Sequence, residues 1–262
     1  MKKHDLLKLA GNAAFIPGIY NYCDLWCERC PFTSRCLNFA TAQEEEKTKA
    51  RPSRESRAFW DKFEDAFRLT QEMLNDLAQE HGVTLDPVAL EQSGRQEERR
   101  RRAAQRHPLA QAARKYARML DDWFKAGERL LREKEEEVLA QAKLGVAGLN
   151  EHVASLTDVV EILRWYQHQI YVKLMRGLER DAREEAASAL PKDADGSVKV
   201  ALIAIDRSIA AWMRMKDFFP QKTDSVLGLL VALDRLRRSA EKEFPNARRF
   251  VRPGFDTEPE AR

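Results

Sequence analysis

The sequence predicts an all-α protein. Apolar residues return every three or four positions through several long segments, strand-like alternation is almost absent, and only 11 of the 262 residues are glycine. A hydrophobic share of 44% can fill a sizeable core, while 33% charged residues indicate helices with strongly solvated faces. We therefore expect an antiparallel up-and-down helical bundle of four to five long helices, with an N-terminal four-cysteine metal-binding loop.

Five long helices account for most of the chain. Phenylalanines and leucines at helical spacing predict the first, and Pro108 suits the first position of the second. The predicted ranges, in order, are 57–80, 108 to about 143, 155 to about 189, 198–215, and 223 or 224 to 244. The fourth could begin as a strand, because its first half is rich in β-branched residues, but its length and its alanines favour a buried helix.

The segments between these helices read as connections. We expect a surface connection or a short helix over 41–56, one helical turn over 85–94, and a solvated linker or helix lead-in over 95–107. Further turns are predicted at 145–148 and 191–196. The domain prediction is an N-terminal metal-binding segment over 1–50, with its cysteine loop at 19–39 packed on the bundle, a helical bundle over 51–246, and a C-terminal tail over 247–262. Two phenylalanines and a valine in the tail suggest that it docks somewhere on the protein rather than staying free.

All four cysteines of the chain lie within fourteen positions, as Cys23, Cys27, Cys30 and Cys36. Free cysteines normally scatter through a core as small apolar residues, so this clustering, with the spacing C-x3-C-x2-C-x5-C, indicates one joint role. We expect that role to be one metal centre. A disulfide pair or unligated thiols are less favoured, since nothing marks the chain as secreted.

Two kinds of metal centre fit this spacing. A [4Fe-4S] cluster is favoured because four thiolates from one compact run, with a proline after a ligand as in Cys30-Pro31, are typical of such clusters. Neighbouring aromatic residues would also limit solvent access to a redox centre. Structural zinc is the alternative, although four-cysteine zinc sites usually have two C-x2-C pairs and only Cys27 and Cys30 form one here.

The triplet Cys23, Cys27 and Cys30 resembles the C-x3-C-x2-C motif of the radical S-adenosylmethionine enzymes. The resemblance covers eight residues and implies a [4Fe-4S] cluster with one iron open for the cofactor, on a partial β/α barrel. The chain departs from that family in two ways. Cys36 lies close enough along the chain to occupy the open iron, and no alternation of strands and helices follows the motif.

A possible second polar site comprises Glu161, His168, Asp206 and Arg207. Glu161 and His168 project along one edge of the predicted third helix, and Asp206 and Arg207 interrupt the most apolar segment. Ferritin-like bundles use Glu-x-x-His, which is absent from this sequence. We therefore expect His168 to be a hydrogen-bonded, partly buried residue, and Asp206 and Arg207 either to pair with neighbouring helices or to line a polar site.

Composition narrows the function further. The net charge is +3, and the arginines of 95–107 are diluted by glutamates and lack interleaved aromatics, which argues against nucleic acid. No signal peptide or stretch of 18 apolar residues is evident, so we expect a cytoplasmic protein without a membrane partner. Phosphate-loop, nucleophile-elbow and His-Glu-x-x-His motifs are absent, and the reaction, if any, stays unassigned. The expected functions are electron transfer or redox sensing with a protein or redox partner, or a structural-zinc scaffold that binds a partner.

Overall fold

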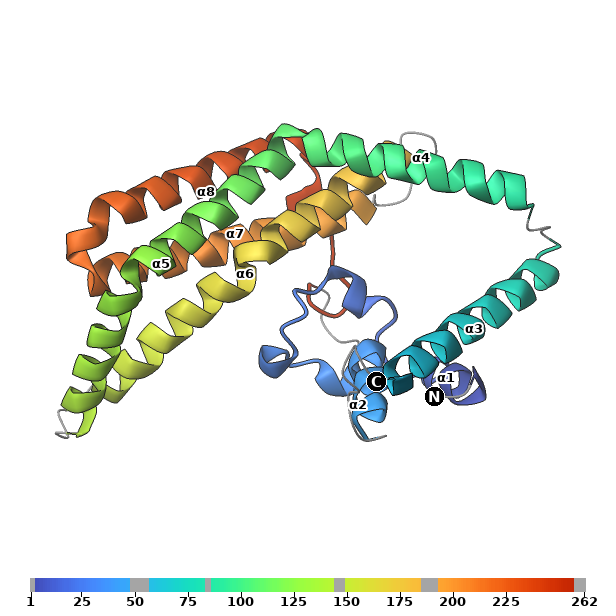
Figure 1. The fold of residues 1–262 in the computed structure, drawn as a ribbon, viewed down its shortest axis with the longest axis horizontal. Coiled ribbons are helices and arrows are strands. Elements are labelled where there is room, and N and C mark those ends of the chain that lie inside the picture. The colour runs from blue at the N-terminus through green and yellow to red at the C-terminus, as the bar shows by residue number, and fades with distance from the viewer. Residues whose placement is uncertain (1–2, 48–56, 83–85, 144–148, 185–192, 257–262) are drawn as a thin grey trace. The chain divides into compact units, whose positions relative to one another are not determined.

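The computed structural model describes residues 3–47, 57–82, 86–143, 149–184 and 193–256 (Figure 1). These residues form eight α-helices joined by loops and short 3-10 turns, and they contain no strand. The all-α prediction is therefore confirmed, and the segment that could have begun as a strand is helical. The described part of the chain likewise lacks the strands of the barrel that the cysteine triplet implied by its resemblance. The turn predicted at 145–148 and residues 257–262 of the tail lie outside the described residues.

The helices follow the predicted order with several corrections. Their bounds are α1 Lys3–Ala10, α2 Leu37–Lys47, α3 Arg57–Glu80, α4 Pro87–Arg106, α5 Pro108–Lys143, α6 Leu149–Glu184, α7 Asp193–Phe218 and α8 Thr223–Glu243. The prediction of a single turn over 85–94 was wrong, because α4 is continuous from Pro87 to Arg106. Of the two alternatives for 95–107, the structure has a helix that leads into α5 rather than a linker. Long side chains such as Arg, Gln and Glu favour the helix there even with little apolar surface to bury.

Two helix starts also differ from the prediction. α6 begins at Leu149 rather than at Ser155, and α7 begins at Asp193, so 193–196 is the first turn of a helix rather than a loop. Asp193 and Asp195 both lie in that first turn. Negative side chains there favour a helix because they interact with the positive end of its dipole.

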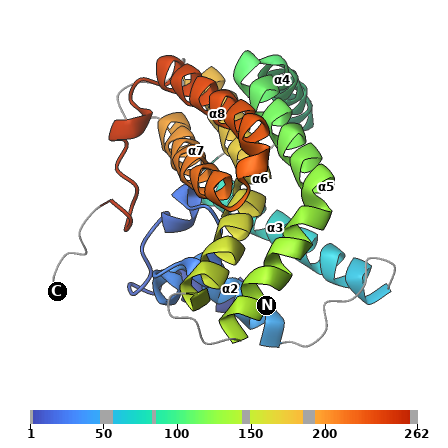
Figure 2. The same ribbon diagram turned by 90° about the vertical axis from the view of Figure 1, so that its left-hand side faces the viewer.

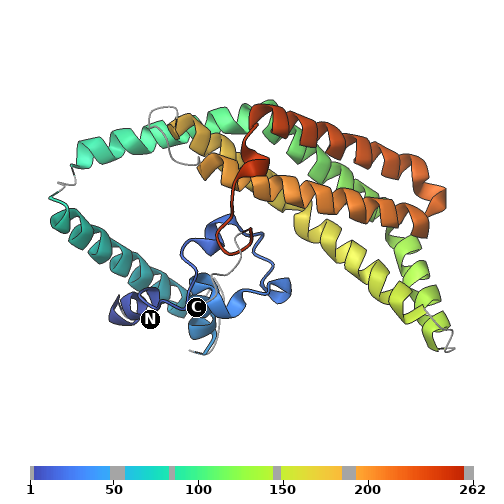
Figure 3. The same ribbon diagram turned by 180° about the vertical axis from the view of Figure 1, so that it is seen from behind.

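The chain divides into two compact units, each described here by itself. Unit 1 is Met1–Glu98 together with Arg252–Arg262, and unit 2 is Arg99–Val251. In unit 2, α6 packs against α5 and α7, and α8 packs against α7 and α5 (Figures 1 and 2). The four helices thus share one bundle-like core. Seen from behind, the 3-10 turn Ala247–Arg249 lies against α7 (Figure 3).

Aromatic side chains fill the centre of unit 2. The ring of Trp212 meets that of Trp123 edge to face, with 5.0 Å between centroids, and Trp123 in turn meets Phe219 at 5.9 Å. Tyr116 and Tyr166 are almost completely buried in the same core. Edge-to-face pairs of this kind contribute about 0.5–1.5 kcal/mol each beyond the area that they bury, so this cluster links α5 to α7 across the core.

The backbones of α6 and α7 approach closely at Gly177. A Cβ added to Gly177 would overlap Cγ2 of Val198 and would lie 3.5 Å from the carbonyl oxygen of Ala194. Glycine is therefore needed at this position for packing, not for an unusual backbone conformation. No described helix has a stretch that is both long and apolar enough to cross a bilayer.

Candidate metal centre

Three short 3-10 turns position the four cysteines in unit 1. The turns are Ile19–Tyr22, Cys27–Arg29 and Thr33–Arg35, and each is followed directly by a cysteine in an extended conformation. Cys23, Cys30 and Cys36 occupy these positions, while Cys27 opens the second turn. The repeated sequence of a tight turn and an extended residue reverses the chain within a few residues. This local geometry allows sulfurs close in sequence to face the same space.

The chain turns most sharply between Cys23 and Cys27. Leu25 has φ 59°, and it is the one described residue other than glycine with a positive φ. Trp26 follows with φ −84° and ψ 75°, and the N–H of Cys27 donates to the carbonyl oxygen of Leu25 at 3.0 Å. These values describe an inverse γ-turn centred on Trp26. A left-handed leucine costs on the order of 1 kcal/mol, and such strain is often found at functional sites.

Backbone contacts close the loop on itself. The N–H of Ile16 donates to the carbonyl oxygen of Arg35 at 3.0 Å, which ties the residues before the first cysteine to those before the last. Gly18 has φ 71°, a conformation that favours glycine, at the start of the first 3-10 turn. Inside the loop, Ile19 and Trp26 are buried, and the guanidinium of Arg29 lies 4.2 Å from the centre of the Trp26 ring.

All four cysteines line one pocket of unit 1. The rest of the wall is mainly apolar, and its aromatic members are Tyr20, Trp26, Phe32, Phe39 and Phe255. The cysteines are free thiols, so the structure joins none of them in a disulfide. No group of three or more His, Cys, Asp or Glu side chains in the described ranges is already arranged to hold a metal ion. The cysteines thus share one pocket as thiols.

The pocket disfavours thiolates that lack a compensating cation. Burial raises the pKa of Cys27, and the neighbouring Cys23, Cys30 and Cys36 raise it further by repulsion, as does Glu28. A bound cation offsets this repulsion, since metals bind the deprotonated thiolate. The backbone N–H of Phe32 also donates a hydrogen bond to Sγ of Cys30 at 3.4 Å. The donor set therefore fits a thiolate-ligated metal.

The C-terminal segment completes the pocket wall. Phe255 meets Phe32 edge to face at 5.1 Å, and the guanidinium of Arg252 lies 4.8 Å from the Phe255 ring while it pairs with Asp256 at 3.0 Å. Gly254 has φ 75°, and a Cβ there would lie 2.9 Å from Cδ1 of Ile16. The prediction that the tail docks is confirmed. The phenylalanines of the tail predicted that it docks, but they did not indicate that Phe255 lines the same pocket as the cysteines.

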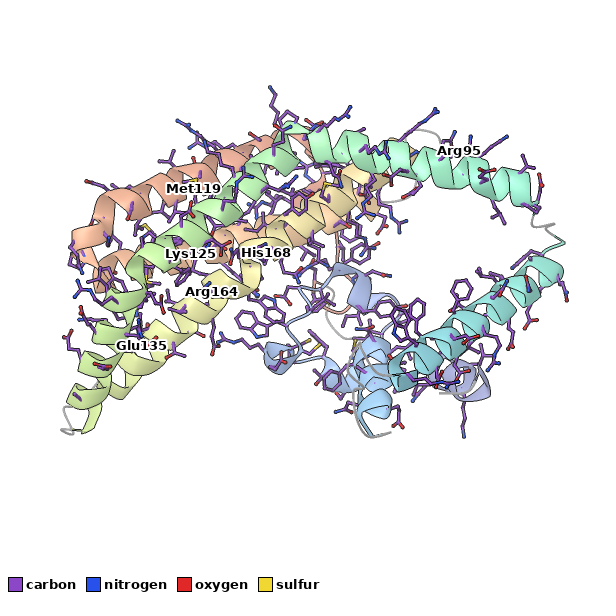
Figure 4. The ribbon with its side chains drawn as sticks, in the orientation of Figure 1. Arg95, Met119, Lys125, Glu135, Arg164 and His168 are labelled. Carbon is purple, nitrogen blue, oxygen red and sulfur yellow. The ribbon has the colours of Figure 1, made fainter. Side chains whose placement is uncertain are left out.

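The four residues of the possible second polar site lie in unit 2, on α6 and α7. Glu161 and His168 lie exposed on α6, so the expectation of a partly buried histidine was wrong. Figure 4 labels His168 one turn beyond Arg164, whose guanidinium lies 3.9 Å from the centre of the Phe124 ring. Exposure places both residues on the solvent face of the helix.

Asp206 and Arg207 make contacts with different neighbours. Asp206 pairs with Arg248 at 2.6 Å and with Arg237 at 3.5 Å, which joins α7 to the C-terminal turn and to α8. Arg207 donates a hydrogen bond to the hydroxyl of Tyr166 on α6. These contacts match the expectation that the two residues pair with neighbouring helices.

The arginine-rich segment is part of α4. Arg95, labelled in Figure 4, pairs with Glu91 at 2.7 Å, and both side chains are largely exposed. An exposed pair one helical turn apart contributes only about 0.3–0.5 kcal/mol. The segment is thus a solvated helix face in which some positive charge is locally balanced.

Comparisons of the chain with protein-family models, with curated proteins and with solved structures gave no match. The function is accordingly argued from the residues and their geometry.

Proposed function

We propose that Cys23, Cys27, Cys30 and Cys36 hold a [4Fe-4S] cluster that transfers electrons or senses redox state. One observation carries the proposal: four free thiols, all the cysteines of the chain, line a single pocket with a mainly apolar wall. Four thiolates from a compact run are the usual ligand set of such a cluster. Metal loading requires the sulfurs to move into ligating positions, a small adjustment for residues that flank 3-10 turns.

The surroundings of the sulfurs suit a redox centre. Aromatic residues exclude water from one side of the pocket, and the N–H of Phe32 hydrogen-bonds a sulfur. Hydrogen bonds to sulfur and solvent exclusion are two of the features by which proteins set the potential of a cluster. Four cysteine ligands would also leave no iron open for substrate, which favours electron transfer or sensing over catalysis on the cluster.

A partner can reach the centre from the loop itself. Tyr20 and Leu25 line the pocket and are also exposed, at 37% and 44% of their surface. We expect a protein redox partner to dock over these two side chains, since electron transfer needs close approach to the cluster. A reducing compartment such as the cytoplasm suits four free thiols. The scaffold that we infer is an antiparallel up-and-down bundle of α5 to α8, with the cysteine loop as its metal-binding segment.

Metal analysis tests the proposal. The protein is purified anaerobically from cells supplied with iron, and its iron, acid-labile sulfide and zinc are measured together with its visible and electron paramagnetic resonance spectra. We expect a brown protein with four irons and four sulfides, and a lower content of both, with an altered spectrum, on replacement of any one cysteine by alanine. Ser34→Ala, an exposed position in the same loop, is the matched control and should keep full loading.

Two results would overturn the assignment. A colourless protein with one equivalent of zinc would make the loop a structural zinc site and the chain a helical scaffold for a protein partner. Iron and sulfide contents that stay at the wild-type level after replacement of two or more of the cysteines would show that the four sulfurs are not one ligand set.

A further inference from the structure

α3 in unit 1 carries a continuous apolar stripe on its surface. Phe63, Phe67, Leu74 and Leu77 are 58%, 65%, 54% and 52% exposed. Together with Thr70 they follow the alternating spacing of four and three residues that defines the a and d positions of a coiled-coil heptad. Trp60, 57% exposed, lies one step before this series, with its ring 6.0 Å from that of Phe63.

Such a helix needs a packed partner. Isolated helices are marginal in water, and most helical stability in proteins comes from burial of an apolar face. A contiguous exposed stripe of aromatic and leucine side chains typically marks an interaction site. The heptad spacing further indicates that the partner is itself a helix, because a and d residues fit between the side chains of a facing helix.

The charges of α3 are compatible with a second α3. The helix has six acidic and three basic residues, but most of them occupy positions away from the stripe, and only Arg57, Glu64 and Glu80 flank it. All three basic residues precede Thr70, whereas Gln71–Glu80 contains acidic charges alone. A parallel pair would place two acidic halves side by side. An antiparallel pair places each acidic half beside the half that holds the arginines and also opposes the helix dipoles.

The stripe is large enough for a specific pair. An aromatic side chain buries about 150–250 Å² when it is fully covered. In each copy, the area that pairing can still bury is about 350 Å² for Trp60, Phe63 and Phe67 together. Leu74, Leu77 and their neighbours raise the area that each copy can bury to roughly 500 Å². Two copies would then bury about 1,000 Å², which is the lower end for a biological interface.

We propose that the stripe of α3 pairs with the same stripe of a second copy of this chain, with the two helices antiparallel. The pairing depends on the heptad register and on the distribution of charge along α3, and it is independent of what the cysteines bind. It makes the protein a dimer that carries two cysteine loops.

Light scattering after size exclusion tests this directly. The wild-type protein should elute at twice its 30.2 kDa at micromolar concentration and approach the monomer mass on dilution. Phe63→Glu with Phe67→Glu should elute as a monomer at every concentration. Asn75→Glu with Gln79→Glu changes the net charge by the same amount at exposed positions away from the stripe, keeps both arginines, and should remain dimeric. Because the altered residues are exposed, the thermal unfolding of unit 2 should be unchanged in all three proteins.

Cross-linking tests the orientation. A photoreactive benzoylphenylalanine in place of Trp60 should form links to residues around Leu77 of a second copy. Wild-type protein that stays at 30.2 kDa, links only within one chain, or a dimer that survives the double substitution would each overturn the proposal. The first two results would instead indicate that α3 covers its stripe with other helices of its own chain.

Discussion

Trp212 Nε1 donates a hydrogen bond to the hydroxyl oxygen of Tyr116 at 3.0 Å in the centre of unit 2. Both side chains are almost completely buried, and they connect α7 to α5 across the core. A buried indole N–H without an acceptor is costly, so the hydroxyl of Tyr116 is a structural requirement of this aromatic core rather than an incidental polar atom.

Replacing Tyr116 with phenylalanine should lower the free energy of unfolding by about 1–3 kcal/mol, because the N–H of Trp212 is left without its partner. Urea unfolding followed by tryptophan fluorescence measures the change. Tyr171→Phe, in a half-buried tyrosine of α6, is the control and should change stability by less than about 0.5 kcal/mol. Equal stability of the two variants would show that the hydrogen bond adds nothing to the fold.

Tyr116 should also make the protein sensitive to alkali. Burial raises the pKa of Tyr116 above its ordinary value, more than its hydrogen bonds to Trp212 and Ser208 lower it. The unfolded chain releases this proton near pH 10 while the folded chain retains it, so stability is complete below about pH 10 and falls as the pH rises further. Between about pH 9 and pH 11, the stability difference between wild type and Tyr116→Phe should therefore shrink. A constant difference across that range would contradict the assignment of the titration to Tyr116.

Gly177→Ala should destabilise unit 2 by about 1–3 kcal/mol, because the new methyl overlaps Val198 across the contact between α6 and α7. In the double variant with Val198→Ala, the total loss should be smaller than the sum of the two single losses, since the smaller side chain removes the overlap. Gly228→Ala on α8 is the control, with nothing within 4 Å of the added Cβ. It should be neutral or stabilise by up to about 1 kcal/mol. If the two losses of stability simply add in the double variant, the cost of Gly177→Ala does not come from overlap with Val198.

Phe255→Ala should open the pocket of the metal-free protein. Loss of the ring removes one aromatic wall and the edge-to-face contact with Phe32. We expect the four cysteines to react severalfold faster with a maleimide reagent, because thiol reactivity depends on access. Val251→Ala, an exposed residue just before the docked segment, should react at the wild-type rate. Unchanged kinetics in Phe255→Ala would mean that the segment does not shield the thiols in solution.

Asp206→Asn should cost at most about 1 kcal/mol and should leave the metal content unchanged. Arg248 holds Asp206 and Glu241 together, and the hydrogen bond that Arg248 donates to Asp206 is the main reason that the pKa of Arg248 is raised. The pair is nevertheless about 39% exposed on each side, and exposed pairs contribute little. A large loss of metal in this variant would show that Asp206 is part of the functional site.

The sequence predicted the helical class and most helix positions because burial imposes a period near 3.6 on the chain, as in α3 and α5. The sequence did not predict α4 as one continuous helix, since a helix of arginines, glutamines and glutamates has no apolar stripe to recognise. The clustering of the cysteines predicted one metal centre, and the structure brings all four into the wall of one pocket as free thiols. Phe255 could not be found in this way, because only the fold brings such a distant residue to the loop. Nor did the sequence show that Glu161 and His168 would be exposed.

The position of Phe255 in the chain also bears on the order of events during synthesis. A ribosome completes the cysteine loop early, long before residue 255 leaves the exit tunnel. Until then the four thiols have an open side, through which a small molecule or a protein can reach them. Docking of Phe255 afterwards closes that side, so a chain interrupted before this point keeps all four cysteines but shields them poorly from oxidants.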